Sequence, residues 1–313
     1  MSVPEATAPE AVTPPKKEQF FYGGQAVIEG VMMRGKRHYA VAVRLPTTKQ
    51  VVIDRGELKA AIYVNPFWKL PFVRGLALIG EQLHLGMKSL MWSANMNAGS
   101  QGVEIGKKEI RSSVAVAGVF ALLLFIGLPL LLAGLAVHHS RGFTFVLVEG
   151  IIRVGLVLGY LSLIALIPDV RRVFQYHGAE HKTINAFESG APLTVAGVAP
   201  QSRLHPRCGT GFLVVVVVVS IVVFTFVGRP ALPLLILSRL LLVPVIAAVA
   251  YELIRLAARH SENPVVARLL VPVLAAQYLT TREPDDSMME VALTAFTAVR
   301  SQDVVPDDPE ILA

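Results

Sequence analysis

Four long apolar runs dominate the hydrophobic pattern of this chain. They cover Val114 to Val137, Phe143 to Ile167, Phe212 to Gly228 and Ala231 to Ala250. Because about 17 to 25 helical residues cross a hydrocarbon core of about 30 Å, each run is long enough to span a bilayer. The third run is rich in valine and would favour a strand in water, but a strand edge in lipid leaves backbone groups unpaired. We therefore predict four transmembrane helices.

The N-terminal region shows a β pattern punctuated by glycine. Its short runs are Gln25 to Met33, Tyr39 to Leu45 and Gln50 to Asp54, with turn-forming residues between them. Such runs are typical of short strands. We predict a small N-terminal antiparallel sheet on the cytoplasmic side.

Helical periodicity outside the long runs indicates further helices. From Pro71 to Trp92 an apolar stripe opposes a polar one, which predicts an amphipathic helix that lies in the membrane interface or packs on the bundle. Pro264 to Leu279 is apolar but too short for an ordinary crossing, so we expect an interfacial or re-entrant segment. Ser287 to Arg300 has the pattern of a final soluble helix. The predicted fold is a mainly α polytopic membrane protein with a small sheet.

Composition and charge agree with this fold class and give it an orientation. The chain is 53% hydrophobic and 17% charged. Of its 29 Lys and Arg residues, 15 precede the first apolar run and five lie between the second and third, whereas the loops 138–142 and 229–230 hold one each. Under the positive-inside rule, both termini and the central loop face the cytoplasm.

These patterns divide the chain into four parts. We expect a disordered leader (1–19), a cytoplasmic β-rich region with its amphipathic helix (20–112), a four-helix membrane domain (113–256) that includes a cytoplasmic loop (168–211), and a cytoplasmic or interfacial C-terminal region (257–313). The leader has no apolar segment of the kind that secretory signals carry. The net charge of +6 follows from basic cytoplasmic loops, so no specific nucleic-acid partner is expected.

The stretch from His177 to His181, with the sequence HGAEH, carries the candidate chemistry. Its two imidazoles are four residues apart and share one face of a helix, with Glu180 beside them. In inverted zinc-hydrolase motifs of the form His-x-x-Glu-His, the histidines bind the metal and the glutamate activates a water molecule. We interpret His177 and His181 as candidate ligands of zinc or another divalent metal, and Glu180 as a candidate general base.

His205 and Cys208, in the same loop, are the candidates for further ligands, because mixed His and Cys ligation suits zinc. Glu188 returns to nearly the same helix face, but seven residues beyond His181 it lies about 10 Å along the axis, too far for a metal bond of about 2 Å. All four candidates, His177, His181, His205 and Cys208, would fill the coordination shell of a zinc ion, as in structural zinc sites. A catalytic site needs one of the four to stay out.

The same residues have two other interpretations. They can form a polar, hydrogen-bonded helix start at the membrane interface, with Cys208 as a small buried hydrophobe. In the second interpretation, Cys208 is a nucleophile that is paired with a histidine, although the sequence offers no recognisable oxyanion-stabilising feature beside it. A single cysteine also excludes an intramolecular disulfide and fits a reducing compartment.

Three ionisable residues lie inside the predicted spans. Glu149 and Arg153 are one helical turn apart and are expected to pair, and Arg239 has no acid near it in sequence, so we expect it to reach Glu149. An unpaired ion in hydrocarbon costs several kcal/mol. These residues therefore indicate either a structural clasp between the second and fourth spans or part of a substrate or ion pathway.

Four blocks of the sequence resemble the signature of the YqhQ-like bacterial membrane proteins. They are Gly23 to Gly35 (GGQAVIEGVMMRG), Tyr176 to Ile184 (YHGAEHKTI), His205 to Phe212 (HPRCGTGF) and Leu279 to Pro284 (LTTREP). The chain departs from the pattern at Val271 to Leu274, where a Pro-Gly pair is expected. The resemblance implies a multi-pass protein of the bacterial inner membrane and a metal-dependent enzyme, without a defined reaction.

Two functions from different classes follow. The first is a non-enzymatic membrane factor or scaffold, embedded in the lipid bilayer, which recruits a protein partner at the cytoplasmic face or forms a homo-oligomer and uses a metal only to hold its loops together. The second is a membrane-embedded zinc-dependent hydrolase that uses His177, Glu180 and His181.

Overall fold

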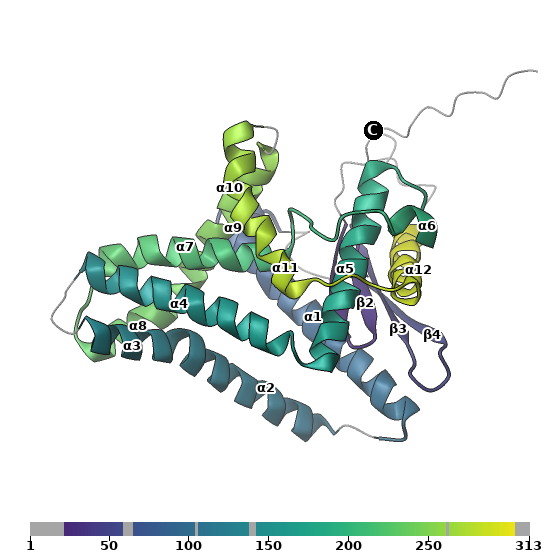
Figure 1. Ribbon diagram of the computed structural model, residues 1–313, viewed down its shortest axis with the longest axis horizontal. Coiled ribbons are helices and arrows are strands. Elements are labelled where there is room, and N and C mark those ends of the chain that lie inside the picture. The colour runs from purple at the N-terminus through teal and green to yellow at the C-terminus, as the bar shows by residue number, and fades with distance from the viewer. Residues whose placement is uncertain (1–21, 59–64, 104–105, 138–141, 261–262, 304–313) are drawn as a thin grey trace, which may run out of the picture.

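The computed structural model describes residues 22–58, 65–103, 106–137, 142–260 and 263–303; the predicted leader (1–19) lies outside them. Within these ranges the chain forms two parts, an α/β head and a bundle of long apolar helices (Figure 1). The candidate chemistry lies where the two parts meet.

The head is built on a four-stranded antiparallel sheet, as the N-terminal pattern predicts. The strands follow one another in chain order: β1 (Gly23–Val27), β2 (Gly30–Arg34), β3 (His38–Arg44) and β4 (Val51–Glu57). The extent of the first predicted strand is wrong, because Gln25 to Met33 folds as a hairpin. The turn contains Glu29 with a φ of 54°, a left-handed conformation that side chains other than glycine rarely adopt and that the sequence does not signal.

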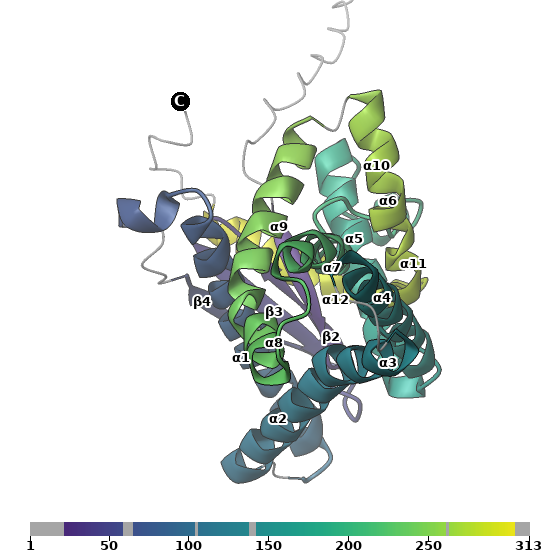
Figure 2. The same cartoon turned by 90° about the vertical axis from the view of Figure 1, so that its left-hand side faces the viewer.

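Helices cover both faces of this sheet (Figures 1 and 2). Side chains alternate across a strand, so Val31 and Met33 of β2 pack against α5 (Pro168–Ser189) and α12 (Asp286–Asp303), whereas Met32 packs on the other face with Leu85. Leu85 belongs to α1 (Val73–Ser100), which is longer than the predicted helix and packs on the sheet and on the bundle. One folded head therefore unites the N-terminal region, the central loop and the C-terminal region.

Among the residues that the structure describes, the bundle contains three helices that are long and apolar enough to cross a membrane, and a fourth if one bent pair counts as a span. The three are Lys108–Ala136, Phe143–Ile164 and Gly209–Val227. The first comprises α2 (Lys107–Leu122), a π-helical turn η3 (Leu123–Gly127) and α3 (Leu128–Ala136); the others are α4 and α7.

The fourth predicted span, Ala231 to Ala250, is a broken helix. It consists of α8 (Leu232–Leu241) and α9 (Val243–Arg259), bent by about 40° at Leu242. Pro244 lies in the first turn of α9, a position where proline is tolerated. If α8 continued through Pro244 as one helix, the backbone would lose a hydrogen bond, because proline has no N–H.

Short helices complete the described chain. They are η2 (Pro66–Lys69), α6 (Val195–Val198), α10 (Pro264–Ala275) and α11 (Gln277–Thr280). The last two form the short apolar element predicted at Pro264 to Leu279. When α7 and α4 are viewed end-on, α9 and α10 are seen along their length, side by side across one end of the bundle (Figure 2).

A buried ion triad joins the helices of the bundle. Glu149 on α4 accepts hydrogen bonds from Arg153 Nη2 at 2.5 Å and from Arg239 Nε and Nη2 at 3.2 and 2.6 Å. Arg153 also donates to Ser220 of α7 and to the carbonyl of Phe125 in the π-helical turn, both at 3.1 Å. The predicted reach of Arg239 to Glu149 is therefore present, and the triad holds α4, α7, α8 and η3 together.

Candidate metal centre

Helix α5 carries the central motif and is fixed by contacts on both sides. It begins at Pro168 and ends before Gly190, whose left-handed φ of 74° stops the helix. Ala179 points into the head core and is fully buried. Gly178 allows the backbone of Arg282 to cross the helix, because a Cβ at this position would collide with the Arg282 carbonyl oxygen. The His177 and His181 side chains consequently extend from the face that looks toward the start of α7.

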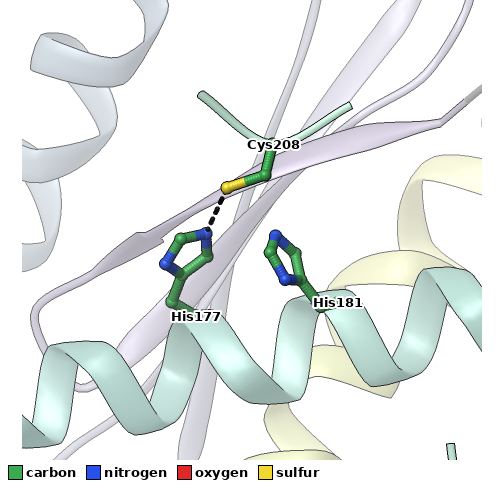
Figure 3. Close-up of side chains that lie close together, drawn as sticks. All are labelled: His177, His181 and Cys208. Atoms are coloured by element: carbon green, nitrogen blue, oxygen red, sulfur yellow. Dashed lines mark hydrogen bonds between the residues drawn. The ribbon is translucent and has the colours of Figure 1, made fainter. Parts of the chain in front are cut away.

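Three potential metal ligands converge at this point (Figure 3). His177 Nε2 lies 3.3 Å from Cys208 Sγ, and the centroids of the His177 and His181 rings are 4.4 Å apart. One donor atom from each of the three residues lies within 4.8 Å of the others. Residues 31 positions apart in sequence thus meet at one site, and Cys208 and His181 are buried there.

The hydrogen bonds of both rings leave the same nitrogen available. His177 Nδ1 contacts the carbonyl oxygen of Thr280 at 2.9 Å, and His181 Nδ1 contacts that of Arg203 at 2.6 Å. Because a carbonyl oxygen only accepts, each Nδ1 must carry the proton and each neutral ring presents its Nε2 lone pair. Histidines that bind metals are typically held in this way, with the second nitrogen donating to a carbonyl or carboxylate.

Cys208 stands at the N-terminus of α7. Its Sγ accepts a hydrogen bond from the backbone N–H of Thr210 at 3.4 Å, in the position of a helix cap. The free amides and the dipole at a helix start stabilise negative charge. The third donor is therefore a sulfur atom that the first turn of α7 holds in place.

Glu180 lies beside these donors without joining them. Its Oε2 is 3.9 Å from His177 Nε2, and the backbone of Gly24 in β1 hydrogen-bonds to it. Burial raises the pKa of Glu180 to about 7, against the opposing effects of His177 and Gly24. A Cβ on Gly24 would lie 2.9 Å from the Glu180 Cγ, so a glycine is needed for strand and carboxylate to approach this closely.

His205 stays out of the group. Its Nε2 contacts Glu188 Oε2 at 3.4 Å, its ring centroid is 5.7 Å from that of His181, and Glu188 is also paired with Arg207. Burial lowers the pKa of His205, although its bond to Glu188 opposes this. Its backbone N–H and carbonyl are both bound by the buried side chain of Gln277, at 2.9 and 2.8 Å. The structure thus brings three of the four predicted ligands together and assigns the fourth to a separate ion network.

The sequence motifs did not identify the backbone groups that orient the site. The carbonyls of Thr280 and Arg203 fix the two rings, and neither residue type indicates such a role. The only signal was the block from Leu279 to Pro284, which contributes Thr280 and the backbone of Arg282 that crosses α5.

The donor set fits a small divalent cation. Ligands that bind tetrahedral zinc at about 2.0 to 2.3 Å lie roughly 3.3 to 3.8 Å from one another. Donor atoms within 4.8 Å would need to close by about 1.5 Å at most to reach this geometry. Two imidazoles and one thiolate are a combination that zinc accepts, and three protein ligands leave a fourth position open.

Comparison with known proteins places the chain in a family. Residues 70–302 match the family model described as "Protein of unknown function (DUF1385)". The chain is 36% identical over 289 residues to the "Uncharacterized protein YqhQ" of Bacillus subtilis (strain 168), an alignment that covers 88% of this chain and 91% of the relative. No solved structure matches. Neither description mentions a metal or an enzyme, so the metal-dependent activity that the resemblance implied has no support from these relatives. The chain therefore belongs to the DUF1385 family and is a relative of YqhQ of Bacillus subtilis.

Proposed function

We propose that this chain is a multi-pass protein of the bacterial inner membrane whose head lies in the cytoplasm. The apolar helices support the membrane assignment, with the bent pair α8–α9 as the fourth pass. The head supports the topology, because its N-terminal, central and C-terminal segments must all be on one side of the membrane to fold together. An even number of passes satisfies this requirement, and the Lys and Arg bias favours the cytoplasmic side.

We further infer that His177, His181 and Cys208 bind a zinc ion at the junction of head and membrane. The observation that carries this inference is the pair of Nδ1–carbonyl hydrogen bonds, which turns both Nε2 lone pairs toward the same sulfur. A merely polar helix start would not need either ring to be held in one tautomer. Three protein ligands also leave one coordination position open, as in catalytic zinc sites, whereas a structural zinc that only holds loops together has four.

The function that this geometry supports best is zinc-dependent hydrolysis. Zinc in an open site acts as a Lewis acid and lowers the pKa of a bound water molecule to about 7. Glu180 is the candidate general base, because its carboxyl group is buried with Oε2 3.9 Å from His177 Nε2, beside the proposed ligands. The non-enzymatic membrane factor is the competing function, in which the same residues only hold the head against the bundle.

Elemental analysis of the detergent-purified protein tests the zinc inference. We expect about one zinc per chain in the wild type, and its loss in His181→Ala and Cys208→Ala. His205→Ala is the matched control: it removes a neighbouring buried imidazole outside the group and should keep the metal. Zinc that is absent from the wild type, or that survives both ligand substitutions, contradicts the inference.

Glu180→Gln separates the enzyme from the membrane factor. The substitution preserves the size of the side chain and is expected to leave the zinc content unchanged while abolishing the cellular function in a complementation assay. If Glu180→Gln binds zinc and complements fully, the hydrolase is excluded and the membrane factor stands.

A further inference from the structure

An apolar groove lies between α9 and α10. It encloses about 290 Å³ and is lined almost entirely by carbon, with Leu253 and Leu256 on α9 and Leu269 on α10. These side chains are exposed rather than packed: Leu256 is 54% and Leu269 71% accessible. Contiguous apolar surface of this kind marks a binding site or a membrane contact.

The groove is continuous with the apolar surface of the bundle. Helix α9 completes the bent pair that forms the fourth candidate span, and α10 is itself a short apolar helix beside it. Both helices are viewed along their length where α4 and α7 are end-on, so the hairpin lies across the end of the bundle (Figure 2). The groove residues of α9 begin at Leu253, after Ala250, where the predicted fourth span ends. This end of α9 and the apolar helix α10 therefore fit the membrane interface, with their apolar faces among the acyl chains.

The groove is also connected to the candidate metal centre. Helix α10 leads into α11, whose Thr280 carbonyl orients His177, and Val273 of α10 packs against Gly211, three residues after the Cys208 cap. Thr280 lies eleven positions after Leu269, which corresponds to roughly 16 Å at the helical rise. Half of a hydrocarbon core, the depth that one acyl chain occupies, is about 15 Å.

Two arginines lie beside α11, and Arg203 Nη1 is also 3.7 Å from Glu283 Oε2. Arg203, whose carbonyl fixes His181, stacks its guanidinium 5.2 Å from the centroid of Tyr278 in α11. Arg282 follows α11 directly and bonds to the carbonyls of Tyr278 and Thr281. An anionic headgroup that reached the site along α11 would meet both guanidinium groups.

We propose that the groove binds the acyl chain of an anionic phospholipid and directs its headgroup along α11 toward His177, His181 and Cys208. The substrate class of the site is then a membrane lipid that enters from the bilayer, an assignment that rests on the proposed hydrolytic function. Binding of the acyl chain itself does not require the metal, because no zinc ligand lines the groove.

Photolabelling of the full-length protein in lipid nanodiscs tests this proposal. The probe is a phosphatidylglycerol with a photoactivatable diazirine in its acyl chain, diluted into phosphatidylcholine, and the adducts are mapped by mass spectrometry. We expect labelling to concentrate on α9 and α10. Leu269→Trp, which fills the groove, should reduce that labelling by about tenfold, equivalent to the loss of roughly two buried methylene groups.

Val271→Trp is the matched control, because Val271 lies on the same helix, is 59% exposed and does not line the groove. It should leave the labelling unchanged. Equal labelling of wild type and Leu269→Trp, or labelling spread evenly over all apolar helices, overturns the proposal. Equal labelling by a phosphatidylcholine probe overturns the preference for an anionic headgroup.

Two measurements separate this proposal from the zinc site. Groove labelling should persist in Cys208→Ala, and the zinc content should persist in Leu269→Trp, which also shows that this variant is folded. Zinc without groove labelling refutes lipid entry alone, whereas groove labelling without zinc refutes the proposed hydrolase and leaves a lipid-binding membrane protein.

Discussion

Glu149→Gln should be among the most destabilising single substitutions in the bundle. Glu149 is 1% exposed and neutralises two arginines, of which Arg239 is also 1% exposed and Arg153 8%. The substitution removes the only negative charge of the triad while both guanidinium groups stay buried. The neutral amide offers one acceptor oxygen in place of two charged ones.

The structure sets the magnitude. Glu149 accepts three charge-assisted hydrogen bonds, each worth about 1.5 to 3 kcal/mol when considered alone. These values are not additive, and removal of one partner from a buried ion pair typically costs about 3 to 5 kcal/mol. We therefore expect a loss of about 3 kcal/mol or more, which is roughly a 150-fold decrease in the folding equilibrium constant.

Equilibrium unfolding of the purified protein in mixed detergent measures this loss. Glu290→Gln is the control, because Glu290 is a 57% exposed carboxylate paired with Arg44, and a surface pair contributes about 1 kcal/mol at most. Replacing all three members of the triad by apolar residues of similar size should restore most of the stability, since no buried charge then remains. The clasp would be refuted if Glu149→Gln and Glu290→Gln had equal effects.

Three further predictions concern the head. Gly24→Ala should lower both the melting temperature and the zinc affinity, because the new Cβ would lie 2.6 Å from a strand carbonyl oxygen; Gly23→Ala, whose Cβ meets nothing within 4 Å, should change neither. Asp285 caps α12, and although burial opposes it, hydrogen bonds from the first turn hold its pKa below the usual value. Asp285→Ala should therefore lower the free energy of unfolding, measured by chemical denaturation at pH 7, by about 1 kcal/mol. This difference from wild type should disappear as the pH falls through the lowered pKa of Asp285, below the unfolded-state pKa of about 3.9. Chelation of zinc should accelerate alkylation of Cys208, the single thiol of the chain, whereas in His181→Ala, which has no metal to lose, the chelator should make no difference.

The apolar runs carried most of the information about the bundle, because hydrocarbon requires every backbone group to be paired within the helix. The reach of Arg239 to Glu149 followed from the same reasoning, since a lone buried cation needs a partner. The break at Leu242 is harder to infer from sequence, because prolines are tolerated within membrane helices when neighbouring groups satisfy the freed carbonyls.

The head shows where local reasoning fails. The hairpin turn at Glu29 lacks a glycine or asparagine signal, and its left-handed conformation is held by Arg172 of α5, whose Nε and Nη2 bind the Glu29 carboxylate at 2.6 and 2.5 Å. Such compensation comes from a helix more than a hundred residues away and leaves no local pattern. The packing of α12 on the sheet likewise depends on contacts between residues far apart in sequence, such as Met33 of β2 and Phe296 of α12 in one apolar core.

The sequence predicted that histidines and a cysteine form the candidate site, but it did not predict which of the four candidate residues come together. The spacing of His177 and His181 fixes their shared helix face, and the Cys208 sulfur reaches them because α7 starts beside α5. His205 is only three residues from Cys208, yet its ring contacts Glu188 instead. Glu188 was excluded as a ligand by its distance along the helix, and the sequence could not reveal that it would retain His205 outside the metal group.

X-ray absorption spectroscopy at the zinc edge tests the central claim most directly. For purified wild-type protein the account predicts one sulfur neighbour at about 2.3 Å, two imidazole nitrogens at about 2.0 to 2.1 Å and one further light atom. Protein without zinc, a zinc shell without sulfur, or a shell that contains a third imidazole would contradict it.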